Sequence, residues 1–130
     1  MLRSVVALIA GFAIMTFTVL IATILAALAM GIAPGAPTPA YLAINLVYSA
    51  AASAIGGYAT ASLAQARHSA HAMILALMIL VVNVSGFFNP QPGQERWYLA
   101  ALIVLGPVSA VVGGRIRVAA VARRAAQVHG

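Results

Sequence analysis

The feature that most constrains this chain is a long stretch without a charged side chain, which covers residues 4–66. One helix needs about 20 apolar residues to cross the roughly 30 Å hydrocarbon core of a bilayer, so the stretch has room for two crossings. Residues 31–39 interrupt it with three prolines and two glycines, which break helices by removing N–H donors and adding backbone freedom. We therefore expect a first span at about residues 5–30 and a second at about 41–65.

Two more apolar segments follow, at about residues 71–88 and 97–114, separated by the polar residues 89–96. Their apolar residues do not alternate with a period of two, and an open sheet in lipid would leave backbone groups unpaired. The predicted fold class is therefore an all-α membrane protein with four transmembrane helices. One bundle would cover residues 1–114, and a basic tail would follow at residues 115–130.

Composition excludes a water-soluble globule. Hydrophobic residues make up 64% of the chain and charged residues 6%, against about 45–50% and 25% in a typical soluble domain. The net charge of +6 does not indicate nucleic acid as a partner, because the arginines are scattered and form no continuous basic face. The absence of cysteine excludes disulfides, thiol nucleophiles and thiolate metal sites.

The first span also admits an interpretation as a secretory signal peptide. Arg3 would supply its basic start, and the Ala-Leu-Ala at residues 27–29 fits the small-residue cleavage pattern. The apolar part of a signal peptide is only about 7–15 residues long, and this run is much longer. We therefore expect an uncleaved anchor, with cleavage as the alternative.

The distribution of the arginines predicts the orientation. In a four-span bundle the N-terminus, the loop after the second span and the tail share one side, which carries six of the seven arginines. The other side carries only Arg96, next to Glu95. By the positive-inside rule, both termini are expected in the cytoplasm. Tyr41, Trp97 and Tyr98 would then stand at the outer ends of their spans, as in an aromatic belt.

An internal repeat relates the two halves of the chain. Tyr41-Leu42-Ala43 recurs 57 positions later as Tyr98-Leu99-Ala100, and Gly56-Gly57 recurs as Gly113-Gly114. Both copies would cross the membrane in the same direction, so the repeat predicts two parallel helical hairpins related by a pseudo-two-fold axis along the membrane normal. Chance similarity between two apolar helices is the alternative.

Small residues recur every four positions on the second and fourth spans. Such ridges let helix backbones approach closely, and in lipid this packing replaces the hydrophobic effect as the source of helix association. We therefore expect these two spans to form the centre of the bundle. The residues with this predicted role are Ser49, Ser53, Gly56, Gly57, Gly106, Ala110, Gly113 and Gly114.

Neutral polar side chains lie near the outer ends of the second and third spans. Asn45 and Asn83 are expected at matching depths, about one turn inside the membrane. A direct amide hydrogen bond between the two helices is one interpretation, and a small polar pocket for a solute is the other. The residues concerned are Asn45, Tyr48, Asn83 and Ser85.

No ionisable side chain falls deep within a predicted span, which argues against a proton-coupled carrier. The small multidrug exporters, which depend on a glutamate in their first helix, are excluded on this ground. The small fluoride channels are disfavoured because the threonine- and serine-rich break of their third helix is missing. His68, His71 and His129 form at most a weak metal site, since no carboxylate or thiolate accompanies them. We expect no catalytic residue, no metal and no cofactor.

The tail is expected to form a short, basic, amphipathic helix. At about 100° per residue over residues 117–129, the arginines gather on one arc and the valines and alanines on the other. Such a helix suits the surface of the anionic inner leaflet; a docking segment for a cytoplasmic partner and a frayed end are the alternatives. The residues predicted to contact inner-leaflet lipid are Arg67, Arg115, Arg117, Arg123 and Arg124.

Residues 56–61 read Gly-Gly-Tyr-Ala-Thr-Ala, and a basic loop, His71-Ala72 and finally Gly113-Gly114-Arg115 follow. With these motifs the chain resembles small four-helix proteins of the bacterial inner membrane that have no assigned activity. The resemblance covers about residues 50–117. It implies a multi-pass protein of the bacterial inner (plasma) membrane and carries over no catalytic residue.

The expected function is that of an integral-membrane subunit without catalytic chemistry. It would act in a structural or accessory role, through helix packing with itself as a homo-oligomer or within a larger membrane complex. The alternative is a small homo-oligomeric channel or passive small-solute transporter that uses neutral polar residues. The sequence names neither a substrate nor a partner beyond the lipid bilayer.

Overall fold

The computed structural model describes residues 2–64 and 68–128, which form four α-helices: α1 (Leu2–Met30), α2 (Pro39–Leu63), α3 (His68–Phe88) and α4 (Arg96–Val128). Each of the four is long and apolar enough to cross a membrane. No strand occurs among these described residues. The prediction of an all-helical chain with four helices fit to span a membrane is therefore confirmed.

Local sequence explains where the first hairpin turns. α1 ends before Gly31, whose φ of 62° lies in the left-handed region that favours glycine. α2 begins with Pro39, at a position where a missing N–H costs little. The hydroxyl of Thr38 caps this helix by accepting a hydrogen bond of 3.2 Å from the backbone N–H of Tyr41. The proline- and glycine-rich segment thus ends one helix and starts the next.

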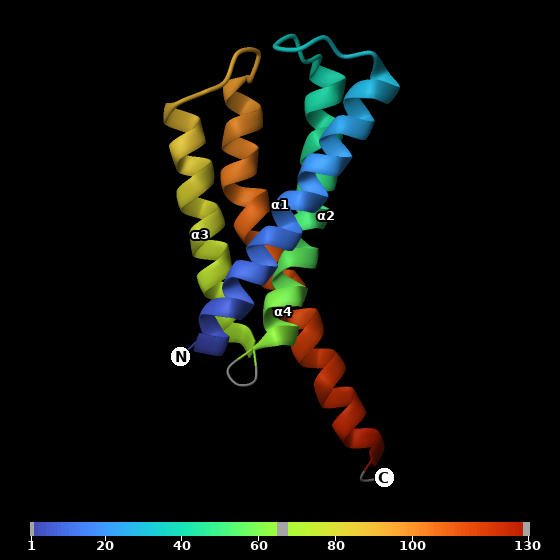
Figure 1. Ribbon diagram of the computed structural model, residues 1–130, viewed down its shortest axis with the longest axis vertical. Helices are drawn as coiled ribbons and strands as arrows, with labels where there is room; N and C mark the ends of the chain where they lie inside the picture. Colours follow the sequence, from blue (N-terminus) through green and yellow to red (C-terminus); the bar gives the residue numbers. More distant parts are fainter. Residues whose placement is uncertain (1, 65–67, 129–130) are drawn as a thin grey trace.

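The chain forms two helical hairpins, α1–α2 and α3–α4, which are joined through α2 and α4 (Figure 1). α1 packs along α2 and, to a lesser extent, against α3. We call the end of the bundle with the loops 31–38 and 89–95 the loop end, and the opposite end, where α1 starts and α2 stops, the terminal end. The two hairpins diverge toward the loop end (Figure 1).

The hairpins are joined by a backbone-to-backbone crossing of α2 and α4. Gly57 lies against the backbone of Ala110, and Gly113 lies against the backbone of Ala54, so that a Cβ on either glycine would overlap the opposite helix. The contact is reciprocal, with one alanine and one glycine from each helix. These residues let the two backbones touch, which maximises dispersion contact in a solvent that provides no hydrophobic drive.

The other small residues predicted for this seam contact different helices. Gly56 faces Met15 of α1, and Gly114 faces Ala72 of α3. Gly106 faces the side chains of Asn83 and Ile79, also on α3. Of the eight predicted packing residues, Gly57, Ala110 and Gly113 therefore form the α2–α4 crossing. Gly56 contacts α1, and Gly106 and Gly114 contact α3.

Two buried clusters hold the bundle together. At the loop end the cluster consists of Tyr41 and Leu42 from α2 with Tyr98 and Leu99 from α4. Toward the terminal end, α3 and α4 pack with the N-terminal half of α1; this cluster contains Leu75, Ala76, Ile79 and Ala110, packed against Leu8, Phe12, Met15 and Val111. The bundle is therefore closed at its terminal end and spread at its loop end.

α4 continues without interruption through the segment expected to be a separate tail. It has 33 residues and is thus about 50 Å long, well beyond the roughly 30 Å of a hydrocarbon core. Gly113 and Gly114 do not end it, because both are buried against neighbouring helices in helical conformation. Figure 1 shows the last turns of α4 projecting beyond the bundle at the terminal end.

Candidate functional site

A cavity of about 520 Å³ lies between the four helices, in the space that the diverging hairpins leave. Its polar lining is neutral throughout and consists of Thr16, Thr23, Asn45, Ser49, Ser53, Asn83, Gln94 and Tyr98. A second hollow of about 340 Å³ shares Thr23, Asn45, Gln94 and Tyr98 with it and is bordered by the two loops. The cavity therefore extends from the middle of the bundle to the loop end.

Asn45 is the centre of a hydrogen-bond network in the part of this cavity nearest the loop end. Its Oδ1 accepts hydrogen bonds from the hydroxyl of Ser49 at 3.0 Å and from that of Tyr98 at 2.8 Å. Its Nδ2 donates to the hydroxyl oxygen of Tyr48, which lies 3.0 Å from Thr23 Oγ1. The network joins α1, α2 and α4 and fixes the rotamers of the groups that line the cavity.

Asn83 connects α3 to α4 on the opposite wall. Its Nδ2 donates a hydrogen bond of 2.7 Å to the backbone carbonyl of Leu102. The next carbonyl along α4, that of Ile103, lacks its usual helical donor because Pro107 has no N–H. In membrane proteins, groups on neighbouring helices commonly compensate such breaks. The side-chain oxygen of Asn83 has no hydrogen-bond partner within the described residues and lies at the cavity wall.

The cavity ends before it reaches the terminal end. Ser53, whose hydroxyl lies 3.7 Å from the sulfur of Met15, stands near its lower limit. Beyond it, Leu75 and Ala110 are fully buried, and the crossing at Gly57 brings the backbones of α2 and α4 into contact. The described residues therefore block the cavity at its terminal end, and at the loop end the two loops meet, with Gly93 against Gly35 and Pro37.

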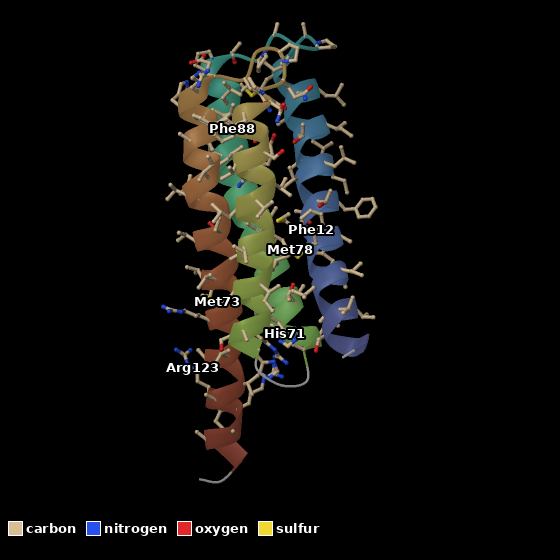
Figure 2. All side chains as sticks on the ribbon, turned by 90° about the vertical axis from the view of Figure 1, so that its left-hand side faces the viewer. Phe12, His71, Met73, Met78, Phe88 and Arg123 are labelled. Atoms are coloured by element: carbon tan, nitrogen blue, oxygen red, sulfur yellow. The ribbon has the colours of Figure 1, made fainter. Side chains whose placement is uncertain are left out.

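One side of the cavity opens to the surface of the bundle between α1 and α3. Leu20 of α1 and Val82 of α3 both line the cavity, yet they are 51% and 54% exposed. Side chains that line a cavity and are also half exposed mark its rim. Figure 2, in which α3 and α1 lie side by side, shows Phe12 of α1 and Met78 of α3 at similar heights.

The structure brings together three of the four residues expected to form a polar pocket or an interhelical bond. Asn45 and Asn83 line the cavity, and Tyr48 supports it through Asn45. The two amides do not pair with each other; each bonds the groups described above. Ser85 is exposed and away from the cavity, and its backbone carbonyl accepts a hydrogen bond from the side chain of Asn89.

Several lining residues were not predicted from the sequence. Thr16 and Thr23 are two turns apart on α1, and this spacing places them on one face. Tyr98, expected in an aromatic belt, is 6% exposed and points into the bundle. Ser49 and Ser53, expected as packing residues, also line the cavity. A count of hydroxyl and amide groups at helical spacing would have identified this set.

At the terminal end, the basic residues do not converge on one site. The guanidinium of Arg117 lies 5.9 Å from the ring centroid of Tyr58 on α2, whereas Arg115, Arg123 and Arg124 are exposed. Arg67 lies outside the described residues. The ring nitrogen Nδ1 of His68 is 2.6 Å from the carbonyl of Ala61, so this histidine closes the end of α2.

No group of three potential metal ligands comes together in the part of the chain that the structure describes, and His129 lies outside it. No known protein family, curated protein or solved structure matches the chain. What the site does is therefore inferred from its own geometry.

Proposed function

We propose that this protein is a non-enzymatic, multi-pass membrane protein that binds a small uncharged ligand in the cavity between its hairpins. The observation that carries this proposal is a cavity of about 520 Å³ whose polar lining, among the residues that the structure describes, holds eight neutral side chains and no charged one. Its volume falls within the range of about 300–1,000 Å³ that small-molecule sites occupy. Its hydroxyl and amide groups both donate and accept hydrogen bonds.

The absence of charge from the lining favours an uncharged ligand. An ion transferred into a low-dielectric bundle keeps a large desolvation cost unless an opposite charge lies beside it. An uncharged ligand needs only hydrogen-bond partners, and the oxygen of Asn83 and the hydroxyl of Thr16 are without partners in the described residues. The site therefore selects ligands by hydrogen bonding and shape.

The packing of the terminal half favours a binding or accessory role over that of a channel. A pore through one copy would have to pass the α2–α4 crossing, where Gly57 and Gly113 hold the two backbones in contact. A passage between copies is the competing function, and the exposed face of α1, with Phe17 and Leu28, would then be covered by another subunit. The mass of the detergent-purified particle and the absence of probe flux into vesicles separate the two functions.

We also propose the finer architecture predicted from the sequence. The reciprocal contacts at the α2–α4 crossing support two parallel hairpins related by a pseudo-two-fold axis, since Ala54 and Gly57 take the places of Ala110 and Gly113 in the other half. This equivalence has an offset of 56 residues, one less than at the Tyr-Leu-Ala motifs. The arginine distribution supports cytoplasmic termini in a bacterial inner membrane, with the loop end outside.

A matched pair of variants tests the proposed site. Thr16 lines the cavity, whereas Thr18 is on the same helix, away from the lining, and its hydroxyl bonds the carbonyl of Ile14. We expect 1,2-hexanediol and hexanamide to raise the unfolding temperature of the wild-type chain in detergent, because a ligand that binds only the folded state stabilises it. Thr16→Phe should abolish the increase, and Thr18→Phe should preserve it.

Charged analogues of the same size provide the control. Hexyl phosphate and hexanoate should produce no increase that depends on Thr16. Equal effects of charged and uncharged probes, or equal effects of the two phenylalanine variants, would contradict a neutral binding site in the cavity.

A further inference from the structure

The cavity is more polar at its loop end than at its terminal end. Toward the loop end its lining contains Thr23, Asn45, Gln94 and Tyr98, which also border the second hollow. Toward the terminal end the lining becomes largely apolar, with Phe12, Met15 and Ile79, and its polar groups there are the hydroxyls of Thr16 and Ser53. Such a gradient matches a ligand with a polar head and an apolar chain, and it is poorly suited to a compact solute that is polar all round.

The rim of the cavity faces lipid, because it lies between two helices whose outer surfaces are apolar. Phe17 and Leu20 of α1 and Met78 and Val82 of α3 are all exposed on the surface of the bundle. A ligand that passes this rim comes from among acyl chains, without crossing water. The decrease in polarity along the cavity also agrees with the proposed orientation. In that orientation the more polar loop end lies at the outer surface, and the less polar end lies near the middle of the bilayer.

The chemistry of the cavity specifies the head of the ligand. Its donors and acceptors are hydroxyl and amide groups, and its lining carries no cation to pair with a phosphate or carboxylate. The hydrogen bonds that hold Asn45 occupy most of its own capacity. The Asn83 oxygen and, deeper in the cavity beside Met15, the Thr16 hydroxyl have no hydrogen-bond partner among the described residues. These two groups would receive the hydroxyls of a glycerol-like head.

From this arrangement we infer that the ligand is an amphiphile with one acyl chain and an uncharged, hydroxyl-bearing head, of the acylglycerol class, which enters between α1 and α3. The inference rests on the proposed function and adds the ligand class and the route. The head lies among Asn83, Thr16 and the network at Asn45. The chain follows the apolar wall toward Phe12 and Ile79 or leaves through the rim.

The test measures binding of monooleoylglycerol to the full-length chain in detergent by native mass spectrometry, with 1,2-hexanediol and oleate as comparison ligands. We expect one molecule of monooleoylglycerol per chain at saturation. It should bind at least about a hundredfold more tightly than 1,2-hexanediol, because the longer chain buries more apolar surface. Oleate, with the same chain and a charged head, should bind at least about tenfold more weakly than monooleoylglycerol.

Variants on both edges of the rim test the route. Thr16→Phe on α1 and Val82→Trp on α3 should each reduce monooleoylglycerol binding by about tenfold or more, and Thr18→Phe should leave it unchanged. Val82 is half exposed, so its substitution leaves the core intact, and circular dichroism verifies the fold of each variant. Two rim variants are used so that a folding defect in one does not decide the result.

The outcomes distinguish the two levels of the proposal. If 1,2-hexanediol binds in a Thr16-dependent manner and monooleoylglycerol binds no more tightly, the acylglycerol inference is wrong and the neutral site stands. If oleate binds as tightly as monooleoylglycerol, the uncharged head is wrong. If no uncharged probe binds in a Thr16-dependent manner, both the inference and the proposed function fail.

Discussion

Asn45 makes more side-chain connections than any other residue described at the cavity. Its amide bonds two groups on its own helix, Tyr48 and Ser49, and one on α4, Tyr98. Through Tyr48 it also reaches Thr23 of α1. In lipid such bonds are individually modest, averaging about 0.6 kcal/mol, so the importance of Asn45 lies in the number of partners that would lose theirs together.

Replacing Asn45 by leucine should lower the free energy of unfolding by about 1–3 kcal/mol, because three hydrogen bonds disappear and buried hydroxyls remain without partners. Denaturant-induced unfolding of the purified chain in mixed micelles measures this change. Ser85→Ala is the control, since Ser85 is exposed and away from the network, and it should change stability by less than about 0.5 kcal/mol. A comparable loss in both variants would contradict the network.

At the scale of the helices, glycine has two different roles in this bundle. Gly57 is pressed against the backbone of Ala110, whereas Gly86 on α3 has open space where a Cβ would stand. At Gly57 the lower helix propensity of glycine is offset by the close approach of two backbones, whereas at Gly86 no close contact requires a residue without a side chain. The same residue type therefore predicts opposite effects of substitution.

Gly57→Ala should destabilise the bundle by about 1–3 kcal/mol, because the added methyl group overlaps a backbone that has no room to move without separating α2 from α4. Gly86→Ala should be neutral or stabilise by up to about 1 kcal/mol, the difference in helix propensity. Thermal unfolding of both variants under one detergent condition compares them. Equal destabilisation of the two would show that the crossing is not a close contact.

The projecting part of α4 yields a prediction of a different kind. The side chains of residues 121–127 are all exposed in the described structure. A chain that ends after Ala120 should therefore unfold within about 0.5 kcal/mol of the full-length chain, since only exposed side chains are lost among the described residues. A large loss of stability would mean that the tail packs onto the bundle in solution. Binding of the two forms to anionic vesicles then measures what the basic tail contributes.

For the molecule as a whole, the sequence determines the spans far better than it determines the site. Residues 4–66 contain no charge, so only length and the proline-rich turn were needed to place two helices. The end of α4 was harder to predict, because Gly113-Gly114 looks like a stop until the packing that buries it is known. Depth along a helix can be read from sequence, but the rotation of one helix against another depends on the packed bundle.

This difference between depth and rotation explains why only some of the residues that line the cavity were predicted. Asn45 and Asn83 were placed at matching depths, and both line the site, yet they bond α4 separately because each faces that helix. Ser85 is two residues from Asn83, about 200° around the helix, and therefore cannot share its face. Tyr98 was assigned to the membrane surface by its position, but its rotation places its hydroxyl inside the bundle.

The orientation of the whole chain can be tested cleanly because it has no cysteine of its own. Single substitutions Ala36→Cys and Gln91→Cys place a thiol on each of the two loops, and Gln127→Cys places one near the end of α4. A maleimide that does not cross membranes should label the first two in intact cells and the third only after lysis. Labelling of Gln127→Cys in intact cells would reverse the assigned orientation.

The crossing of α2 and α4 also has a mechanical consequence. It lies toward the terminal end of the bundle, and sixteen residues, or about 24 Å of helix, separate Gly57 from Tyr41 near the loop end. A tilt of a few degrees between the hairpins about this crossing would therefore move their loop ends by ångströms. The two loops meet at that end, where Gly93 lies against Gly35 and Pro37, so a ligand that spread the hairpins would have to separate this loop contact.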